Sequence, residues 1–171
     1  AGHGDHGAYY VAGDGATVDA DGYVWILGRL DDVVNVSGHR LSTIEIESSL
    51  VAHPGVGEAG VTGIFDQITG QAVAAFVVDG ASRLSDADLE RELRAQITRD
   101  IGPIAKPKVI VRVPELPKTR SGKILRRLLA QLWQDDPLGD TTSLQNPWAV
   151  DSVRDAVRAA QHPRVSPKET T

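Results

Sequence analysis

The chain has 171 residues and a formal net charge of −5, and its 24% charged and 41% hydrophobic residues are typical of one globular domain with or without appendages. It has no cysteine, which excludes disulfides, thiolate metal sites and a cysteine nucleophile, and its 5% aromatic content argues against a surface that stacks on nucleic-acid bases. No apolar run reaches the roughly 18 residues that span a bilayer and no secretory leader is visible, so we expect a cytoplasmic protein that contacts neither membrane nor nucleic acid.

The first 30 residues predict a loop followed by a β-hairpin. Residues 1–7 are rich in glycine and show no apolar periodicity, so we expect a loop there. Strands are predicted for 9–16 and 18–28, with Asp21-Gly22 as a turn, because glycine tolerates the positive φ that tight turns need. The abrupt glycine-rich start and the absence of methionine favour a piece of a larger protein.

The rest of the chain alternates between strand and helix patterns. One helix is expected to begin near Ser42, which has the capping-box spacing to Glu45, and a longer helix follows Ser85. The predicted elements are strands at 33–36, 56–64, 71–78 and 109–113, and helices from 42, from 85, at 124–134 and at 150–161. This order predicts an α+β fold in which a small mixed sheet is flanked by helices. We expect residues 135–147 to be irregular and 162–171 to be disordered.

Half of the basic residues lie in one segment. Nine of the 18 fall between Arg99 and Arg127, and Glu115 is the only acid from Ile101 to Arg127. One basic segment in an acidic chain favours a local anionic ligand over a polyanion that covers the surface. The simpler alternative is a solvated basic helix face.

Within this segment, Gly122-Lys123 resembles part of a phosphate-binding loop. A Walker A loop needs a glycine five residues earlier and a serine or threonine next, but Pro117 and Ile124 stand at those positions. That type of loop is therefore excluded. The ammonium of Lys123 can still reach a phosphoryl or carboxylate oxygen from its long stem. The alternative is a basic loop that opens a basic helix.

Two earlier segments carry further candidate residues. Asp31 and Asp32 are adjacent on a backbone that we expect to be extended, so their side chains point to opposite sides and a shared metal ion is disfavoured. Ser37-Gly38 predicts a tight turn that leaves Arg40 free to meet an anion, or a plain hairpin with a surface arginine. Asp14, between two glycines, fits either an acceptor for ribose hydroxyls or a simple turn.

Together these segments resemble the C-terminal part of AMP-forming acetyl-CoA synthetases, from about Tyr9 to about Val150. The motifs GRLDD, SGHR and PKTRSGK mark the adenylate-forming superfamily, whereas SGHRLSTIEIE, IGPIA and LGDTTSL point to acetyl-CoA synthetases. The resemblance implies three parts: the edge of a large adenylate-binding domain at 1–30, a mobile C-terminal lid at 31–147, and a C-terminal helix and tail at 148–171.

The resemblance implies a two-step reaction with ATP and CoA as substrates. Acetate and ATP give acetyl-AMP and pyrophosphate, and CoA then displaces AMP to give acetyl-CoA. Lys123 matches the adenylation lysine and Asp31 matches the hinge between two poses of the lid. Asp14 matches the carboxylate that holds the ribose hydroxyls, Arg29 the arginine beside it, and Arg40 an arginine near the AMP phosphate. Mg²⁺ is expected with ATP, and no metal site is predicted in this chain.

For CoA, the resemblance points to the Ser37-Gly38 turn. Gly38 matches the loop that lines the pantetheine tunnel, where a side chain should obstruct the thiol. The family often places an arginine near the CoA nucleotide on the helix before IGP. Thr98 stands at that position here, and Arg99 next to it is the candidate substitute, although its direction differs by about 100° around the helix.

The resemblance also implies partners. These are the large N-terminal domain missing from this chain, a GNAT-type acetyltransferase that modifies Lys123, and a sirtuin-type deacetylase that restores it. We expect Arg120, Arg126 and Arg127 to dock an acidic surface of the acetyltransferase, and the chain alone to be inactive. The alternatives are a related short-chain synthetase that uses propionate and, more distantly, a basic interaction or nucleic-acid-binding module.

Overall fold

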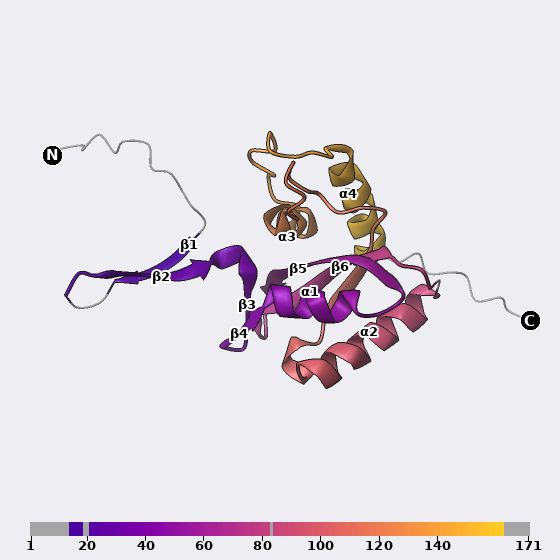
Figure 1. Ribbon diagram of the computed structural model, residues 1–171, viewed down its shortest axis with the longest axis horizontal. Coiled ribbons are helices and arrows are strands. Elements are labelled where there is room, and N and C mark those ends of the chain that lie inside the picture. The colour runs from indigo at the N-terminus through magenta and orange to yellow at the C-terminus, as the bar shows by residue number, and fades with distance from the viewer. Residues whose placement is uncertain (1–13, 19–20, 83, 163–171) are drawn as a thin grey trace, which may run out of the picture.

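The computed structural model describes residues 14–18, 21–82 and 84–162 (Figure 1). The strands are β1 (Asp14–Val18), β2 (Val24–Arg29), β3 (Val33–Val36), β4 (His39–Ser42), β5 (Val56–Asp66), β6 (Gly70–Asp79) and β7 (Val109–Arg112). The helices are α1 (Thr43–Val51), α2 (Asp86–Asp100), α3 (Arg126–Gln134) and α4 (Trp148–Gln161), with short 3-10 turns η1 (Leu30–Asp32) and η2 (Pro103–Ala105). No helix in these described ranges is long and apolar enough to cross a membrane.

One mixed sheet of five strands forms the body of the protein. Strands β4, β3, β6 and β5 are antiparallel neighbours, and β7 pairs with β6 in parallel. Strand β3 meets β6 at Val36 opposite Gly70, while β7 pairs farther along β6. Strands β1 and β2 form a separate hairpin that projects from this body (Figure 1). The predicted α+β fold with a small mixed sheet is confirmed.

Helices cover both faces of the sheet because its central strand is apolar on both sides. Along β6, Val73, Ala75 and Val77 face one core with α1 and α2, and Ala72, Ala74 and Phe76 face a second core with α3 and α4. This alternation is the period of two that a strand imposes on its side chains. Figure 1 shows the two helix pairs on opposite sides of β5 and β6. The sheet thus has one apolar core on each face.

The two serine caps predicted the starts of α1 and α2 correctly, whereas α3 and α4 each begin two residues from their predicted starts. The Ser42 hydroxyl accepts a hydrogen bond from the Glu45 N–H at 3.3 Å, and Ser85 caps α2 in the same way through Asp88. Helix α3 begins at Arg126 rather than 124, because Ile124 pairs with Lys118 in an isolated β-bridge. Residues 39–42 form a strand that the sequence did not predict.

The N-terminal hairpin differs from its prediction in its boundaries. Strand β1 ends at Val18 and β2 begins at Val24, whereas we expected strands at 9–16 and 18–28. Gly22 has φ +86°, as the predicted Asp21-Gly22 turn requires. Residues 9–13 of the first predicted strand and the expected tail at 163–171 lie outside the described residues.

Candidate functional site

The segment that joins the hairpin to the sheet holds two carboxylates with separate partners. Arg29 donates two hydrogen bonds to Asp31, from Nε to Oδ1 at 2.8 Å and from Nη2 to Oδ2 at 3.1 Å. Asp32 accepts a hydrogen bond from Nη1 of Arg126 at 2.8 Å. Our expectation of extended backbone here is wrong, because the chain makes the 3-10 turn η1 as it passes from β2 into β3. The two aspartates thus pair with different arginines.

Arg126 lies in a buried ion-pair network. Its side chain is 9% exposed, and it forms a two-pronged pair with Glu47 of α1, with both N–O distances at 2.7 Å. Glu47 also accepts the Val61 N–H at 2.8 Å. The hydrogen bonds that Arg126 donates to the Glu47 carboxylate raise the pKa of Arg126 despite its burial. The expectation that Arg126 docks an acetyltransferase is therefore wrong, since its charge is consumed inside the domain.

Glu47 is a residue that the sequence analysis missed. It lies beside Ile46 and three positions before Leu50, at the edge of the apolar stripe of α1. That spacing is the one signal that marks it as partly buried, since residues three apart share a helix face. A buried carboxylate needs a cation, and the basic segment supplies it.

Lys123 lies in a turn whose backbone is held by hydrogen bonds to Thr119, while its side chain is exposed. The Thr119 N–H donates to the Lys123 carbonyl at 2.9 Å, and the Lys123 N–H donates to the Thr119 hydroxyl at 3.1 Å. Gly122 has φ +81°, a conformation that favours glycine. Lys123 is exposed, and within the described residues no carboxylate lies within ion-pairing distance of it. The ammonium is thus presented to solvent on a defined loop.

The charge of Lys123 contributes to the low pKa of Asp31. Burial acts to raise the pKa of Asp31, but the hydrogen bond and charge of Arg29, together with the charge of Lys123, outweigh it. The pKa of Asp31 therefore lies below its ordinary value, and the carboxylate is ionised at neutral pH. The structure brings Lys123, Asp31 and Arg29 together near Val33, the first residue of β3.

The Ser37-Gly38 turn lies at the opposite end of β3. It is a two-residue hairpin turn with φ +49° and +83°, and the Ser37 N–H donates to the Thr69 carbonyl at 2.9 Å. Arg40 follows on β4 with an exposed side chain. The four residues of β3 separate this end from Asp31 by about 13 Å at the usual strand rise. Lys123 and Asp31 thus lie at one end of β3, and the Ser37-Gly38 turn lies at the other with Arg40 close beside it.

The remaining predicted residues lie elsewhere. Arg99 is at the end of α2, 70% exposed and paired with Asp100 at 3.1 Å, and the Thr98 hydroxyl bonds back to its own helix. The groove beside Arg99 and the hollow beside the Ser37-Gly38 turn both have Lys106 in their walls. Asp14 begins β1 opposite Arg29, and its side chain is outside what the structure describes.

Comparisons with known proteins agree with this arrangement. Residues 45–123 match the model of the AMP-binding enzyme C-terminal domain. The chain carries this domain. It is 55% identical to the acetyl-coenzyme A synthetase of Mycobacterium bovis over 153 residues, covering 90% of this chain and 23% of that protein.

Two other proteins are similar to this chain over most of its length. The acetyl-coenzyme A synthetase of Rubrobacter xylanophilus is 52% identical over 157 residues, covering 91% of this chain and 24% of that protein. The crystal structure of an acyl-CoA synthetase from Brucella canis is 39% identical with a TM-score of 0.59, over 73% of this chain and 23% of that one. The chain thus spans about a quarter of the length of the curated relatives it matches. The predicted resemblance to the adenylate-forming superfamily is confirmed.

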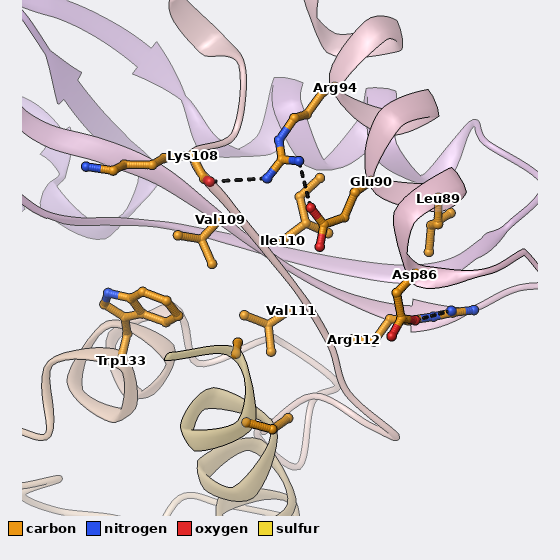
Figure 2. A pocket seen from close by; sticks show the side chains of 13 residues that line it. Asp86, Leu89, Glu90, Arg94, Lys108, Val109, Ile110, Val111, Arg112 and Trp133 are labelled. Atoms are coloured by element: carbon orange, nitrogen blue, oxygen red, sulfur yellow. Dashed lines mark hydrogen bonds and ion pairs between the residues drawn. The ribbon is translucent and has the colours of Figure 1, made fainter. Parts of the chain in front are cut away.

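A separate hollow of about 530 Å³ lies between α2, β7 and α4 (Figure 2). None of the predicted site residues lines it. Its Arg94 donates to Glu90 at 2.6 Å and to the Lys108 carbonyl at 3.2 Å, and its Arg112 pairs with Asp86. These charged groups already have partners within the protein. We therefore consider the hollow a poorer candidate for binding a polar ligand than the two ends of β3.

Acid is expected to weaken this domain at Asp66. The Lys108 ammonium and the groups of Thr69 and Ile68 that donate to the carboxylate hold the pKa of Asp66 well below its ordinary value. A carboxyl with a lower pKa in the folded state stabilises the fold above about pH 4, and that stabilisation is lost as the pH falls further. Asp66→Asn should therefore flatten the acid side of the stability profile. Urea unfolding at a series of pH values checks this, and parallel profiles for the two proteins would contradict it.

Proposed function

We propose that this chain is the C-terminal portion of an AMP-forming acetyl-CoA synthetase, which makes acetyl-CoA from acetate, ATP and CoA through acetyl-AMP. The observation that carries the proposal is the separation of Lys123 from the Ser37-Gly38 turn by the length of β3. A domain with different groups at its two ends suits two half-reactions if it presents one end at a time. The identity of 55% to an acetyl-coenzyme A synthetase supports acetate as the acid.

In the first half-reaction, Lys123 acts as the catalytic lysine. Its exposed ammonium, free of carboxylate partners among the described residues, is suited to contact acetate and phosphate oxygens. A positive donor placed where negative charge accumulates lowers the barrier to acetyl-AMP. Asp14 is proposed to hold the ribose hydroxyls with Arg29 beside it, and Arg40 is proposed to lie near the AMP phosphate. Mg²⁺ is expected to accompany ATP, but the described residues contain no cluster of three or more possible ligands, so no step is assigned to it.

The hinge is proposed to lie at Asp31. On one side, Arg29 belongs to the projecting hairpin, and on the other, Asp32 is tied to the sheet body through Arg126. Asp31 is thus the residue between two anchored neighbours, where a change in backbone angles would swing the body as a unit. The proposed divisions at 31 and 148 rest on this placement and on the family resemblance.

In the second half-reaction, the Ser37-Gly38 turn is proposed to line the path of the CoA thiol, with Arg99 near the CoA nucleotide. A Cβ added at Gly38 would meet no atom of this chain within 4 Å. No other part of the described chain fills the space beside Gly38, so a ligand has room to approach the backbone there.

Gly38→Leu is expected to slow acetyl-CoA formation from supplied acetyl-AMP by about tenfold or more while acetyl-AMP formation continues, because the side chain obstructs the thiol. Gly22→Leu is the matched control, since Gly22 has φ +86° against +83° for Gly38 and equally open surroundings. Both variants carry the same backbone strain. Equal loss in the two variants would show that strain alone, and not obstruction, causes the effect.

Lys123 is also proposed as a target of reversible acetylation by a GNAT-type acetyltransferase and a sirtuin-type deacetylase. Its exposure supports access by another enzyme, and acetylation would remove the charge that the first half-reaction needs. Of the three arginines first expected to dock the acetyltransferase, Arg120 and Arg127 remain exposed. Mapping the modified lysine in the complete enzyme by mass spectrometry tests this.

The proposed function is tested on the complete enzyme that contains this chain. We expect pyrophosphate release that requires both acetate and ATP, and acetyl-CoA formation that requires CoA. The 171-residue chain alone should do neither, because the large domain supplies the rest of the site. Absence of the CoA-dependent step would reject the synthetase, and a higher kcat/KM with propionate would reassign the acid.

A further inference from the structure

The short loop between β5 and β6 is held by one buried carboxylate. The Asp66 side chain is 6% exposed, and its Oδ1 accepts the N–H groups of Ile68 and Thr69 at 3.0 and 2.9 Å. The Thr69 hydroxyl lies 2.9 Å from the same oxygen and 2.7 Å from the Gln71 carbonyl. The other oxygen of Asp66 pairs with the ammonium of Lys108, just before β7. One side chain thus fixes the loop and ties it to a neighbouring strand.

This loop in turn fixes the Ser37-Gly38 turn. The Thr69 carbonyl accepts the Ser37 N–H at 2.9 Å, and the side-chain oxygen of Gln71 accepts the Asn35 N–H at 2.8 Å. Ser37 has φ +49°, which a residue with a Cβ adopts only at a cost. Such a conformation persists where the surroundings determine it. Here the β3–β4 hairpin requires it, and the hydrogen bond that the Ser37 N–H donates to the Thr69 carbonyl helps to hold it.

We infer that Asp66 is a positioning residue for the Ser37-Gly38 turn, acting through Thr69 and braced by Lys108. The inference rests on the proposed function, in which this turn lines the path of the thiol. Asp66 is proposed to act without touching the substrates. It sets the place and the conformation of the backbone that does touch them, and Lys108 holds the carboxylate in the orientation that keeps both loop N–H groups satisfied.

The test compares three variants of the complete enzyme in the two half-reactions. Asp66→Ala should raise the KM for CoA or lower the rate of the CoA step by about tenfold, because a displaced turn misplaces the thiol. Acetyl-AMP formation should stay within about twofold of the unmodified enzyme, since Lys123 lies at the other end of β3. Asp66→Asn keeps an oxygen acceptor for the loop and should recover most of the loss. Lys108→Met, at a side chain that is 60% exposed, should show a smaller effect of the same kind.

A second readout does not depend on the reaction. In the 171-residue chain, Asp66→Ala should speed hydrogen exchange at the Ser37 amide by about tenfold, because its bond to Thr69 weakens. Asp140→Ala is the matched control, because Asp140 caps another exposed loop through Thr142 N–H and hydroxyl at 2.9 and 2.7 Å. It should leave both Ser37 exchange and the CoA step unchanged.

Unchanged Ser37 exchange in Asp66→Ala, or equal losses in both half-reactions, would overturn the inference. If the unmodified enzyme shows no CoA-dependent step, the proposed function fails instead. The exchange measurement then decides by itself whether Asp66 positions the turn.

Discussion

Lys123→Ala in the complete enzyme is expected to slow acetyl-AMP formation by about 10²–10³-fold, the usual cost of removing one donor that stabilises developing negative charge. Acetyl-CoA formation from supplied acetyl-AMP should persist. The physical reason is distance: Lys123 lies beside Asp31 at the start of β3, and the turn proposed for CoA lies at its end. Pyrophosphate release and acetyl-CoA formation, measured separately, check the two halves.

Arg120→Ala is the matched control, because Arg120 is an exposed cation in the same loop and three residues away. Both half-reactions should survive it. If Lys123→Ala leaves both half-reactions intact, Lys123 is an ordinary basic residue and the site assignment is wrong. If Lys123→Ala abolishes both half-reactions while the fold is intact, Lys123 has a role beyond the adenylation step.

Arg126→Met in the 171-residue chain is expected to lower the free energy of unfolding by about 3–5 kcal/mol, the usual cost of removing one partner from a buried ion pair. The change keeps much of the apolar stem but leaves Glu47, whose side chain is 12% exposed, without its cation. Asp32 loses its partner as well. Urea unfolding followed by circular dichroism gives the difference.

The control is Arg127→Met on the next residue of α3. Arg127 is exposed and donates to the carbonyls of Leu138 and Asp140, so its loss should cost about 1 kcal/mol. Adding Glu47→Leu to Arg126→Met removes the uncompensated charge and should recover part of the loss. A cost for Arg126→Met no greater than for Arg127→Met would show that the network adds little to stability.

The fold was predictable where the pattern is local. The apolar repeat of α2, the serine caps and the apolar run of β6 each define an element without reference to distant residues. Strand β4 was missed because three of its four residues are polar and exposed, and only pairing with β3 makes them a strand. The start of α3 moved because a bridge to Lys118 holds Ile124 extended.

Motifs in the sequence pointed to candidate site residues, but they did not show which side chains would form ion pairs. Lys123, Asp31 and the Ser37-Gly38 turn were identified from motifs within short segments. From the sequence alone, by contrast, the basic segment is a run of cations without evident partners, because almost no acidic residues lie among them in the chain. In the folded chain, Lys108, Arg112, Lys118 and Arg126 take carboxylates from other elements. This pairing also argues against a nucleic-acid surface, which needs basic side chains free to meet phosphates.

The sequence by itself determined the class of fold, the loop that carries Lys123 and the turn that carries Gly38, because each depends on contacts within a few residues. The tertiary structure decided which charges remain available. It buried Arg126 against Glu47, linked Asp66 to the Ser37-Gly38 turn through Thr69, and left Lys123 exposed. Ion pairs and loop anchors join residues far apart in the chain, so the free energy of each side chain depends on neighbours that only folding brings near.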